Sequence, residues 1–328
     1  MYLTKYNAAG SLTDVSLRVL TIFSRALTFE LFALACAGHS AWGACVTNSF
    51  SADAFVRAAA PTFNYGGAGA LSVSGANATN GQNVTNGAFD SFVRFNSAGV
   101  VTNFDSMFGT NNWVINGARL RVTEVGAPNN AVFNRGTGSF EVRWIADNDW
   151  TEGTGRPNAP TMDGISYSNE VTLLNSNADL SLGTFTNAGV DGTMSFWLEL
   201  PAGFLSNVRA GTYVGLFLTA SDSGIGFTFN SRDYQGAGAQ PDIEISAVPR
   251  PGIASVSVTG ADVVLACTNG TAGGTYYVLS TTNLAMPPNQ WQAVGTNFPS
   301  YNGDFAITLT NTASGGGPGA QFFMLQTQ

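Results

Sequence analysis

From Cys45 onward the chain consists of short runs of alternating apolar and polar residues, each ended by Gly, Asn, Ser or Pro. This period of two is typical of strands that bury one face, and frequent turn residues keep such strands short. No stretch keeps a helical period over three turns. Because short strands need a second sheet to cover their apolar face, the pattern predicts an all-β fold, with an antiparallel, jelly-roll-like β-sandwich of about 200 residues.

The expected strands of this sandwich are marked by apolar residues two positions apart. They are Val93 and Phe95; Leu120 and Val122; Phe140, Val142 and Trp144; Phe196, Leu198 and Leu200; Val214, Leu216 and Leu218; and Ile243 and Ile245. The segment 75–87 is rich in Asn and Gly and is expected to be a loop. No internal repeat is found, which argues against a solenoid or a propeller.

A second domain is expected after the large sandwich, which we place at residues 44–248. Residues 249–252 (PRPG) are stiffened by two prolines and ended by a glycine, as in a linker. Residues 253–328 then hold six apolar runs, at 255–258, 263–266, 276–279, 291–294, 305–309 and 322–325. This size and number of strands predict a small immunoglobulin-like β-sandwich.

The first 43 residues have the pattern of an export signal peptide. A positive segment with Lys5, Arg18 and Arg25 precedes an apolar stretch at 26–37, and small residues follow near Gly43. The stretch is too short for a transmembrane helix, and no second long apolar run follows. We therefore expect a secreted or cell-surface protein without a transmembrane segment in its mature part.

The residues after this leader include no His and no Lys, and ten Arg stand against 19 Asp and Glu, a net charge of −9. Such a chain repels nucleic acid and anionic lipid, so neither is an expected partner. It also lacks the usual general base and amine nucleophile, which argues against an enzyme, although catalysis by a carboxylate pair stays open. Zinc is excluded because only two Cys remain. These are Cys45 and Cys267, and since they lie in different expected domains we predict two free thiols.

Residues 144–160 combine a strand end with two tryptophans, three carboxylates and many turn residues. Two interpretations fit. The segment is either a ligand-binding shelf, with aromatic faces for sugar rings and polar groups for hydroxyls, or a strand end whose tryptophans are core residues. In the second interpretation, which the frequency of buried aromatics favours, Glu152 accepts backbone N–H bonds from the following loop.

Carboxylates also raise the question of a structural calcium ion, because calcium prefers oxygen ligands. Asp147 and Asp149 are close in sequence and form one possible site. A second possibility places Asp53, near the first strand, beside Asp242 or Glu244 in the last one. The last two are out of phase with the apolar residues of their strand and should point outward. The alternative is that these acids are ordinary solvated side chains.

Residues 52–246 resemble the DNRLRE family of secreted β-sandwich proteins. The matching pieces occur in order along the chain: ADAFV at 52–56, NYG at 64–66, FVRF at 92–95, ARLRV at 118–122, WTE at 150–152, FNSRD at 229–233 and PDIEI at 241–245. Asp233 departs from the family pattern, which has Glu there, and the segment 156–160 lacks the usual tryptophan. The tail, with YYVLSTTNL at 276–284, resembles a small C-terminal sandwich of exported bacterial proteins.

Some DNRLRE members are carbohydrate-binding modules, so the resemblance implies non-catalytic attachment to an extracellular or cell-surface polysaccharide. In that role the stacking residues would be Trp150, Tyr167 and Tyr234, and the hydrogen-bonding residues Asp149, Glu152 and Arg232. The alternative is a structural, adhesin-like subunit that self-associates and has no glycan pocket. Arg94 and Arg232 are interpreted first as partners of nearby acids such as Glu152 or Asp233.

Overall fold

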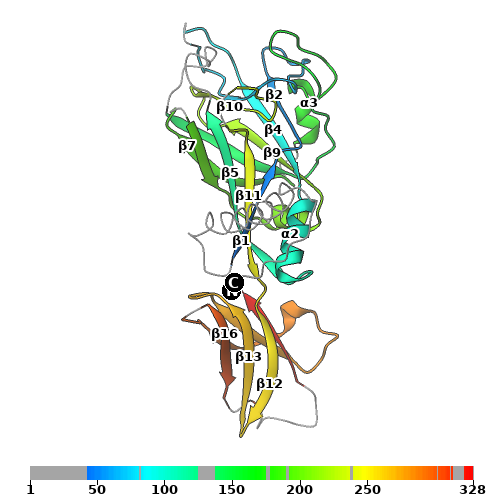
Figure 1. Cartoon of the computed structure of the whole chain (residues 1–328), viewed down its shortest axis with the longest axis vertical. Helices are drawn as coiled ribbons and strands as arrows, with labels where there is room; N and C mark the ends of the chain where they lie inside the picture. Colours follow the sequence, from blue (N-terminus) through cyan, green and yellow to red (C-terminus); the bar gives the residue numbers. More distant parts are fainter. Residues whose placement is uncertain are drawn as a thin grey trace, which may run out of the picture. The chain divides into compact units, whose positions relative to one another are not determined.

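The computed structural model describes residues 43–80, 83–124, 137–174, 178–189, 192–236, 239–300, 302–310, 312 and 321–327. Apart from Gly43, the expected leader lies outside these ranges. The chain forms two compact units, one of Cys45–Arg250 and one that contains Pro251–Gln328 (Figure 1). Strands dominate both units, so the expected all-β class is confirmed.

The larger unit contains eleven strands among its described residues. They are β1 (Ala44–Ser49), β2 (Ala52–Arg57), β3 (Ala70–Ser74), β4 (Phe89–Asn96), β5 (Trp113–Glu124), β6 (Gly138–Ile145), β7 (Leu180–Asn187), β8 (Gly192–Trp197), β9 (Tyr213–Ala220), β10 (Gly226–Asn230) and β11 (Asp242–Pro249). Each of the six strands predicted from alternation has a counterpart, but β8 ends at Trp197, so Leu198 and Leu200 follow the strand. The predicted loop at 75–87 carries no strand in its described part.

These strands form two layers of a sandwich. One layer has the order β1, β11, β5, β8, and the other has β2, β4, β9, β6, β7. Strand β5 pairs antiparallel with β11 and β8, and neighbours in the second layer are likewise antiparallel. Strands β3 and β10 pair with each other and connect the two layers. Strand β10 pairs with β5 of the first layer and β3 with β4 of the second, at one residue pair each. Phenylalanines join the layers: Phe196 of β8 lies 5.2 Å from both Phe140 of β6 and Phe185 of β7, measured between ring centroids.

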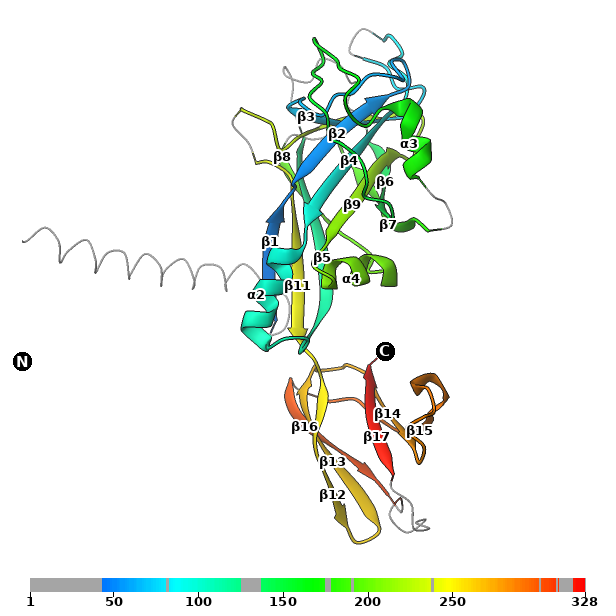
Figure 2. The same cartoon turned by 90° about the vertical axis from the view of Figure 1, so that its right-hand side faces the viewer.

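Three helices lie between the strands in the described part of the larger unit, and the sequence pattern did not predict them. They are α2 (Ala98–Phe108), α3 (Tyr167–Leu173) and α4 (Ala202–Arg209). Helices α2 and α4 lie at one end of the sandwich and α3 at the other, as Figure 2 shows. In α2 and α4 only one pair of apolar residues, four positions apart, is buried: Val100 with Phe104, and Phe204 with Val208. None of the described helices is long or apolar enough to cross a bilayer.

The described residues of the smaller unit form two three-stranded sheets. One has the order β12 (Gly252–Thr259), β13 (Asp262–Gly270), β16 (Gly303–Leu309), and the other β15 (Gln292–Asn297), β14 (Tyr276–Thr281), β17 (Phe322–Thr327). A short 3-10 helix, η1 (Pro288–Gln290), precedes β15. The core contains Leu265, Val278 and Ile307. Every predicted strand of this domain is present, in the two-sheet arrangement expected of a sandwich.

The cysteines differ from the expectation. Cys267 is a free thiol buried in the core of the smaller unit, and burial raises the pKa of this thiol. Cys45 is disulfide-bonded. The two therefore do not pair with each other, as expected, but the prediction that both are free is wrong for Cys45, because spacing along the chain does not report which sulfurs meet in space.

Candidate functional site

The segment 146–155 forms the corner that follows β6, and its residues divide between an inner and an outer side. Trp150 is only 6% exposed and packs into a core cluster, with its ring centroid 5.9 Å from that of Phe92. The predicted stacking of Trp150 on a sugar is therefore wrong, because its ring has no free face in solvent. Trp144 is also buried. For both tryptophans the interpretation as core residues is confirmed.

Arg94 connects this corner to the strand beside it. Its guanidinium lies 4.8 Å from the ring centroid of Trp150 and 4.9 Å from that of Tyr213, at the start of β9. The same group donates hydrogen bonds to the carbonyl oxygens of Asn148 and Trp150, at 2.8 and 3.0 Å. Arg94 thus stacks against both rings and fixes the corner through its backbone, rather than pairing with Glu152 or Asp233 as expected.

Outside this stack lies a shallow groove of about 660 Å³. It is lined by residues of the corner, of α4 and of the start of β9: Ala146, Asp147, Asn148, Asp149, Asn207, Thr212 and Tyr213. Tyr213 is 48% exposed, and Asp147 and Asp149 are exposed beside it. Asp149 also lines a second hollow of about 390 Å³, next to Trp150 and α3. We call the first of these the Tyr213 groove.

The other predicted stacking residues do not line this groove. Tyr167 is the first residue of α3 and packs, half-buried, against the core cluster of Trp150. Tyr234 is half-buried in the connection between β10 and β11. Near Tyr167, burial raises the pKa of Glu170 to about 8, and the charge of Asp90 adds to this rise. The pKa of Asp90 is itself raised to about 6, mainly by burial.

On the inner side of the corner, Glu152 and Arg232 form the expected ion pair. The Arg232 Nε and Nη2 atoms donate to the two Glu152 carboxylate oxygens at 2.8 and 2.9 Å. Glu152 Oε1 also accepts the backbone N–H of Asp53 at 2.8 Å, and Asp53 Oδ2 accepts the backbone N–H of Arg232 at 2.7 Å. Both predicted hydrogen-bonding groups are thus used inside the protein.

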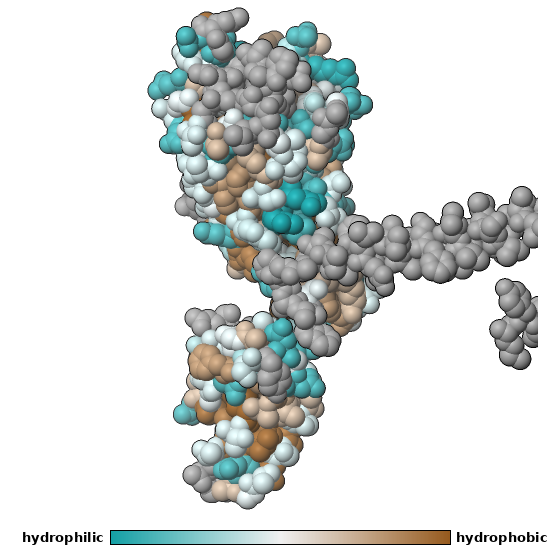
Figure 3. Space-filling model, turned by 60° about the vertical axis from the view of Figure 1, so that its left-hand side comes forward, coloured by the Kyte–Doolittle hydropathy of each residue, from teal (hydrophilic) through white to brown (hydrophobic). Residues whose placement is uncertain are grey.

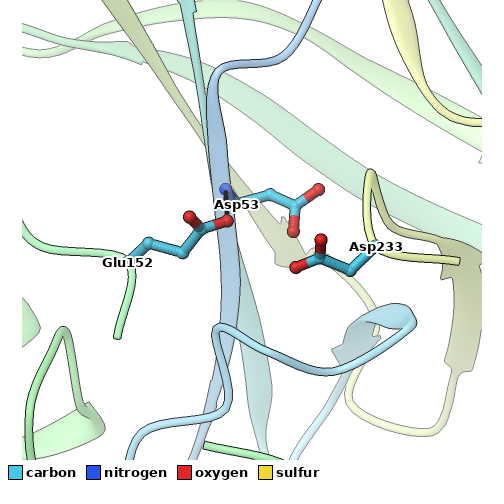
Figure 4. Close-up of side chains that lie close together, drawn as sticks. All are labelled: Asp53, Glu152 and Asp233. Atoms are coloured by element: carbon cyan, nitrogen blue, oxygen red, sulfur yellow. Dashed lines mark hydrogen bonds between the residues drawn. The ribbon is translucent and has the colours of Figure 1, made fainter. Parts of the chain in front are cut away.

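Asp53 and Asp233 complete this grouping, which we call the Asp53 cluster. One carboxylate oxygen from each of Asp53, Glu152 and Asp233 lies within 4.8 Å of the others. Figure 4 shows the Asp53 and Asp233 carboxylates facing each other, with Glu152 beside the Asp53 backbone. Asp53 is fully buried. Burial raises its pKa to about 7, against a hydrogen bond from the Arg232 backbone that lowers it, and the charges of Glu152 and Asp233 raise it further.

Asn64 holds the corner against the segment that follows β2. Its side-chain nitrogen donates to the carbonyl oxygens of Glu152 and Ile165, at 2.6 and 2.8 Å, and its side-chain oxygen accepts the backbone N–H of Gly66 at 2.9 Å. The two backbones approach so closely that a Cβ on Gly66 would overlap the carbonyl of Glu152. Glycine is required there because no larger residue fits.

The five acids proposed as calcium ligands do not come together. Asp242 and Glu244 alternate with the buried Ile243 and Ile245 along β11, but Glu244 is only 6% exposed, so its predicted outward position is wrong. The two acids pair with Arg121 and Arg119 of the neighbouring strand, at 2.6 and 2.8 Å. Asp147 accepts the backbone N–H of Asp149 in the exposed corner. Of the five, Asp53 alone belongs to the Asp53 cluster, because its strand pairs with β4 and not with β11.

Most of the sequence pieces that carry the family resemblance lie close to one another in the structure. Residues 52–56, 64–66, 150–152 and 229–233 converge on the Asp53 cluster, while 118–122 and 241–245 pair as β5 and β11. Sequence reasoning missed Asp233 as a member of the cluster, although its position after Arg232 in the 229–233 motif was a signal. It also missed Asn207, Thr212 and Tyr213, which precede an apolar strand and carry no motif.

Comparisons with known proteins add no family. No family model matches the chain, and no curated protein matches. Two solved structures are similar only weakly. The glycoside hydrolase domain of Endo-D from Streptococcus pneumoniae R6 shows 10% identity and a TM-score of 0.16, and the match covers 86% of this chain and 37% of that one. A T=3 Penaeus vannamei nodavirus structure shows 8% identity and a TM-score of 0.19, over 88% and 86%. The chain spans little more than a third of the hydrolase domain it matches.

Proposed function

We propose that this is a secreted, non-catalytic protein whose larger unit binds a polysaccharide through the Tyr213 groove. The observation that carries the proposal is the exposed ring of Tyr213, held by Arg94 beside carboxylate and amide side chains in one hollow. Aromatic rings offer an apolar face to the C–H groups of sugars, and they lose little conformational freedom on binding because they are stiff.

The polar residues of the groove suit sugar hydroxyls. Asp147 and Asp149 accept hydrogen bonds, and Asn207 both donates and accepts. The groove is open rather than enclosed, which suits a glycan chain that enters and leaves the site. Because two exposed carboxylates line it, a neutral or amino-substituted polysaccharide is favoured over an acidic one, whose like charge would be repelled.

The composition of the chain is consistent with this use. Charged residues make up only 10% of the chain, and the face drawn in Figure 3 mixes hydrophilic, intermediate and hydrophobic residues. A surface rich in Ser, Thr, Asn and Gly offers weak, adaptable hydrogen bonds, and it does not impose a strong field that selects charged partners.

The test is retention of the full chain on a panel of immobilised neutral, amino and acidic polysaccharides. We expect retention on a neutral or amino glycan, a loss of at least about tenfold in affinity for Tyr213→Ala, and a smaller loss for Tyr213→Phe, which keeps the ring. The matched control is Trp197→Ala: Trp197 is 46% exposed and also lies beside a guanidinium, that of Arg119 at 5.3 Å, but it lies on β8 outside the groove.

Three results would contradict the proposal. Loss of retention in Trp197→Ala but not in Tyr213→Ala would move the site to the outer face of β5 and β8. Absence of retention on every glycan, together with concentration-dependent assembly, would support the structural, self-associating subunit instead. Release of soluble sugars from a retained polysaccharide would show an enzyme that works with carboxylates.

A further inference from the structure

The Asp53 cluster brings three acids together from distant parts of the chain. Asp53 lies on β2, Glu152 in the corner after β6, and Asp233 in the connection between β10 and β11. Their oxygens lie within 4.8 Å of one another. Two oxygens bound to the same calcium ion, each at 2.3–2.6 Å, lie at most about 5 Å apart. The spacing of the three acids therefore matches that of ligands on a common ion.

A second observation points to a ligand. Asp53 is 0% exposed, and its Oδ1 atom has no hydrogen-bond partner. A buried carboxylate oxygen without a partner is unfavourable, and it is more unfavourable when it is charged. The other carboxylate oxygen of Asp53 accepts the Arg232 backbone N–H. The side chain is thus held in place by one oxygen while the other remains available.

Charge and lone pairs are also suited to a divalent cation. When all three are ionised, the carboxylates carry three negative charges, and the Arg232 guanidinium offsets one of them through Glu152. Glu152 Oε1 accepts two hydrogen bonds, whereas Oε2 accepts one from Arg232 and keeps a free lone pair. Two uncompensated charges and three hard oxygen donors remain for an ion.

We propose that Asp53, Glu152 and Asp233 hold a calcium ion that joins β2, the corner and the β10–β11 connection. Calcium is favoured because it accepts oxygen ligands in flexible geometries with water completing the shell, whereas magnesium requires near-ideal octahedral ligation and zinc prefers nitrogen and sulfur. The site shares no residue with the Tyr213 groove. The sequence predicted Asp53 as a calcium ligand, but not together with Glu152 and Asp233.

The experiment measures the thermal unfolding midpoint, Tm, of the full chain after treatment with EDTA, and then with calcium or magnesium added at constant ionic strength. Titration extends to on the order of 10 mM, above the ~10⁻³ M upper end of dissociation constants for extracellular calcium modules. We expect calcium to raise Tm by roughly 5 °C, and magnesium to raise it less. Isothermal calorimetry without any glycan gives the stoichiometry, expected to be one.

The variants are Asp53→Asn and Asp233→Asn. Asp53→Asn keeps an oxygen that can accept the Arg232 backbone N–H, and Asp233→Asn changes a less buried position, so at least one is expected to fold. Both should lose the calcium-dependent rise in Tm. The matched control is Asp147→Asn, which removes one charge from the exposed corner and should keep the full rise.

Calcium binding that is absent in calorimetry, or a rise in Tm that persists in both Asp53→Asn and Asp233→Asn, would overturn the proposal. A rise that disappears equally in Asp147→Asn would show general screening of acidic charge, which also overturns it. Because no glycan is present in these measurements, their failure leaves the Tyr213 groove untouched, and failure of glycan retention leaves the calcium result untouched.

Discussion

The corner 146–155 contributes residues to both the Asp53 cluster and the Tyr213 groove, which differ in their surroundings. In the Asp53 cluster, carboxylates and a guanidinium are turned inward and bind one another and the backbone. In the Tyr213 groove, the carboxylates of Asp147 and Asp149 are turned outward, and the guanidinium of Arg94 lies between a buried and an exposed ring. Residues a few positions apart thus serve the fold on one side and are free for a ligand on the other.

The largest effect is expected in the free energy of unfolding, and it should differ between Trp150 and Trp197, which both lie beside an arginine. We expect Trp150→Ala to reduce the free energy of unfolding by about 3–5 kcal/mol, because it removes a large buried ring and leaves a cavity. Trp197→Ala, at a half-exposed ring, should cost about 1 kcal/mol or less. Chemical denaturation of both variants checks this. Similar costs for the two would show that Trp150 is not part of the core.

The next effect concerns pH and a third acidic grouping, Glu170 with Asp90. The pKa of Glu170 rises from 4.5 to about 8 on folding, so the folded protein holds a proton that the unfolded chain releases between these values. Stability is then fully present below pH 4.5 and is lost as pH rises through about 8.

Glu170→Gln removes this titration. The unfolding free energy of the variant, followed from pH 5 to pH 9, should therefore decline less than that of the unchanged protein. A decline from Asp90 should remain, since the pKa of Asp90 is raised to about 6 mainly by its own burial. Parallel profiles for the two proteins would mean that Glu170 reaches solvent in the folded state.

How far the sequence predicts this molecule depends on whether a signal is local. Alternation along one strand is local, and so β4, β6 and β9 could be located without the structure. Helix α2 could not, because Val100 and Phe104 form only one buried pair and Phe104 packs on Trp113 of β5, 5.1 Å away between ring centroids. That contact forms only once the chain has folded.

The candidate site shows the same limit. The sequence predicts the pairing of Glu152 with Arg232, because an arginine flanked by apolar strand residues commonly pairs with a carboxylate. The burial of Trp150 was one of two open interpretations, since a strand end does not reveal whether the following corner folds inward. Asp233 lies 180 positions from Asp53, and Tyr213 resembles the core residues that follow it. Both required the tertiary fold.

A smaller effect on stability tests whether the ion pair of the Asp53 cluster is shielded from solvent. In EDTA, Glu152→Gln should cost about 2 kcal/mol, because Gln places an amide NH₂ opposite the donors of Arg232. Combining it with Arg232→Met should recover part of this loss, since both partners of the pair are then removed. Asp149→Asn, in the groove, should change stability by no more than about 0.5 kcal/mol. A double-mutant cycle with no coupling would show that the ion pair is solvated.

The smallest effect concerns Arg94, which contacts both the buried Trp150 and the exposed Tyr213 of the groove. Arg94→Lys keeps the charge but loses the planar group that stacks against Trp150 and Tyr213, and we expect a cost of about 1 kcal/mol in stability. Polysaccharide retention should also weaken, although Arg94 is not among the residues that line the groove, because the Tyr213 ring loses its support. Arg57→Lys is the matched control, since Arg57 stacks on Phe89 at 5.3 Å, away from the groove. If polysaccharide retains both variants equally well, the orientation of Tyr213 does not depend on its stacking with Arg94. The buried side of the corner and the groove outside it would then be energetically independent.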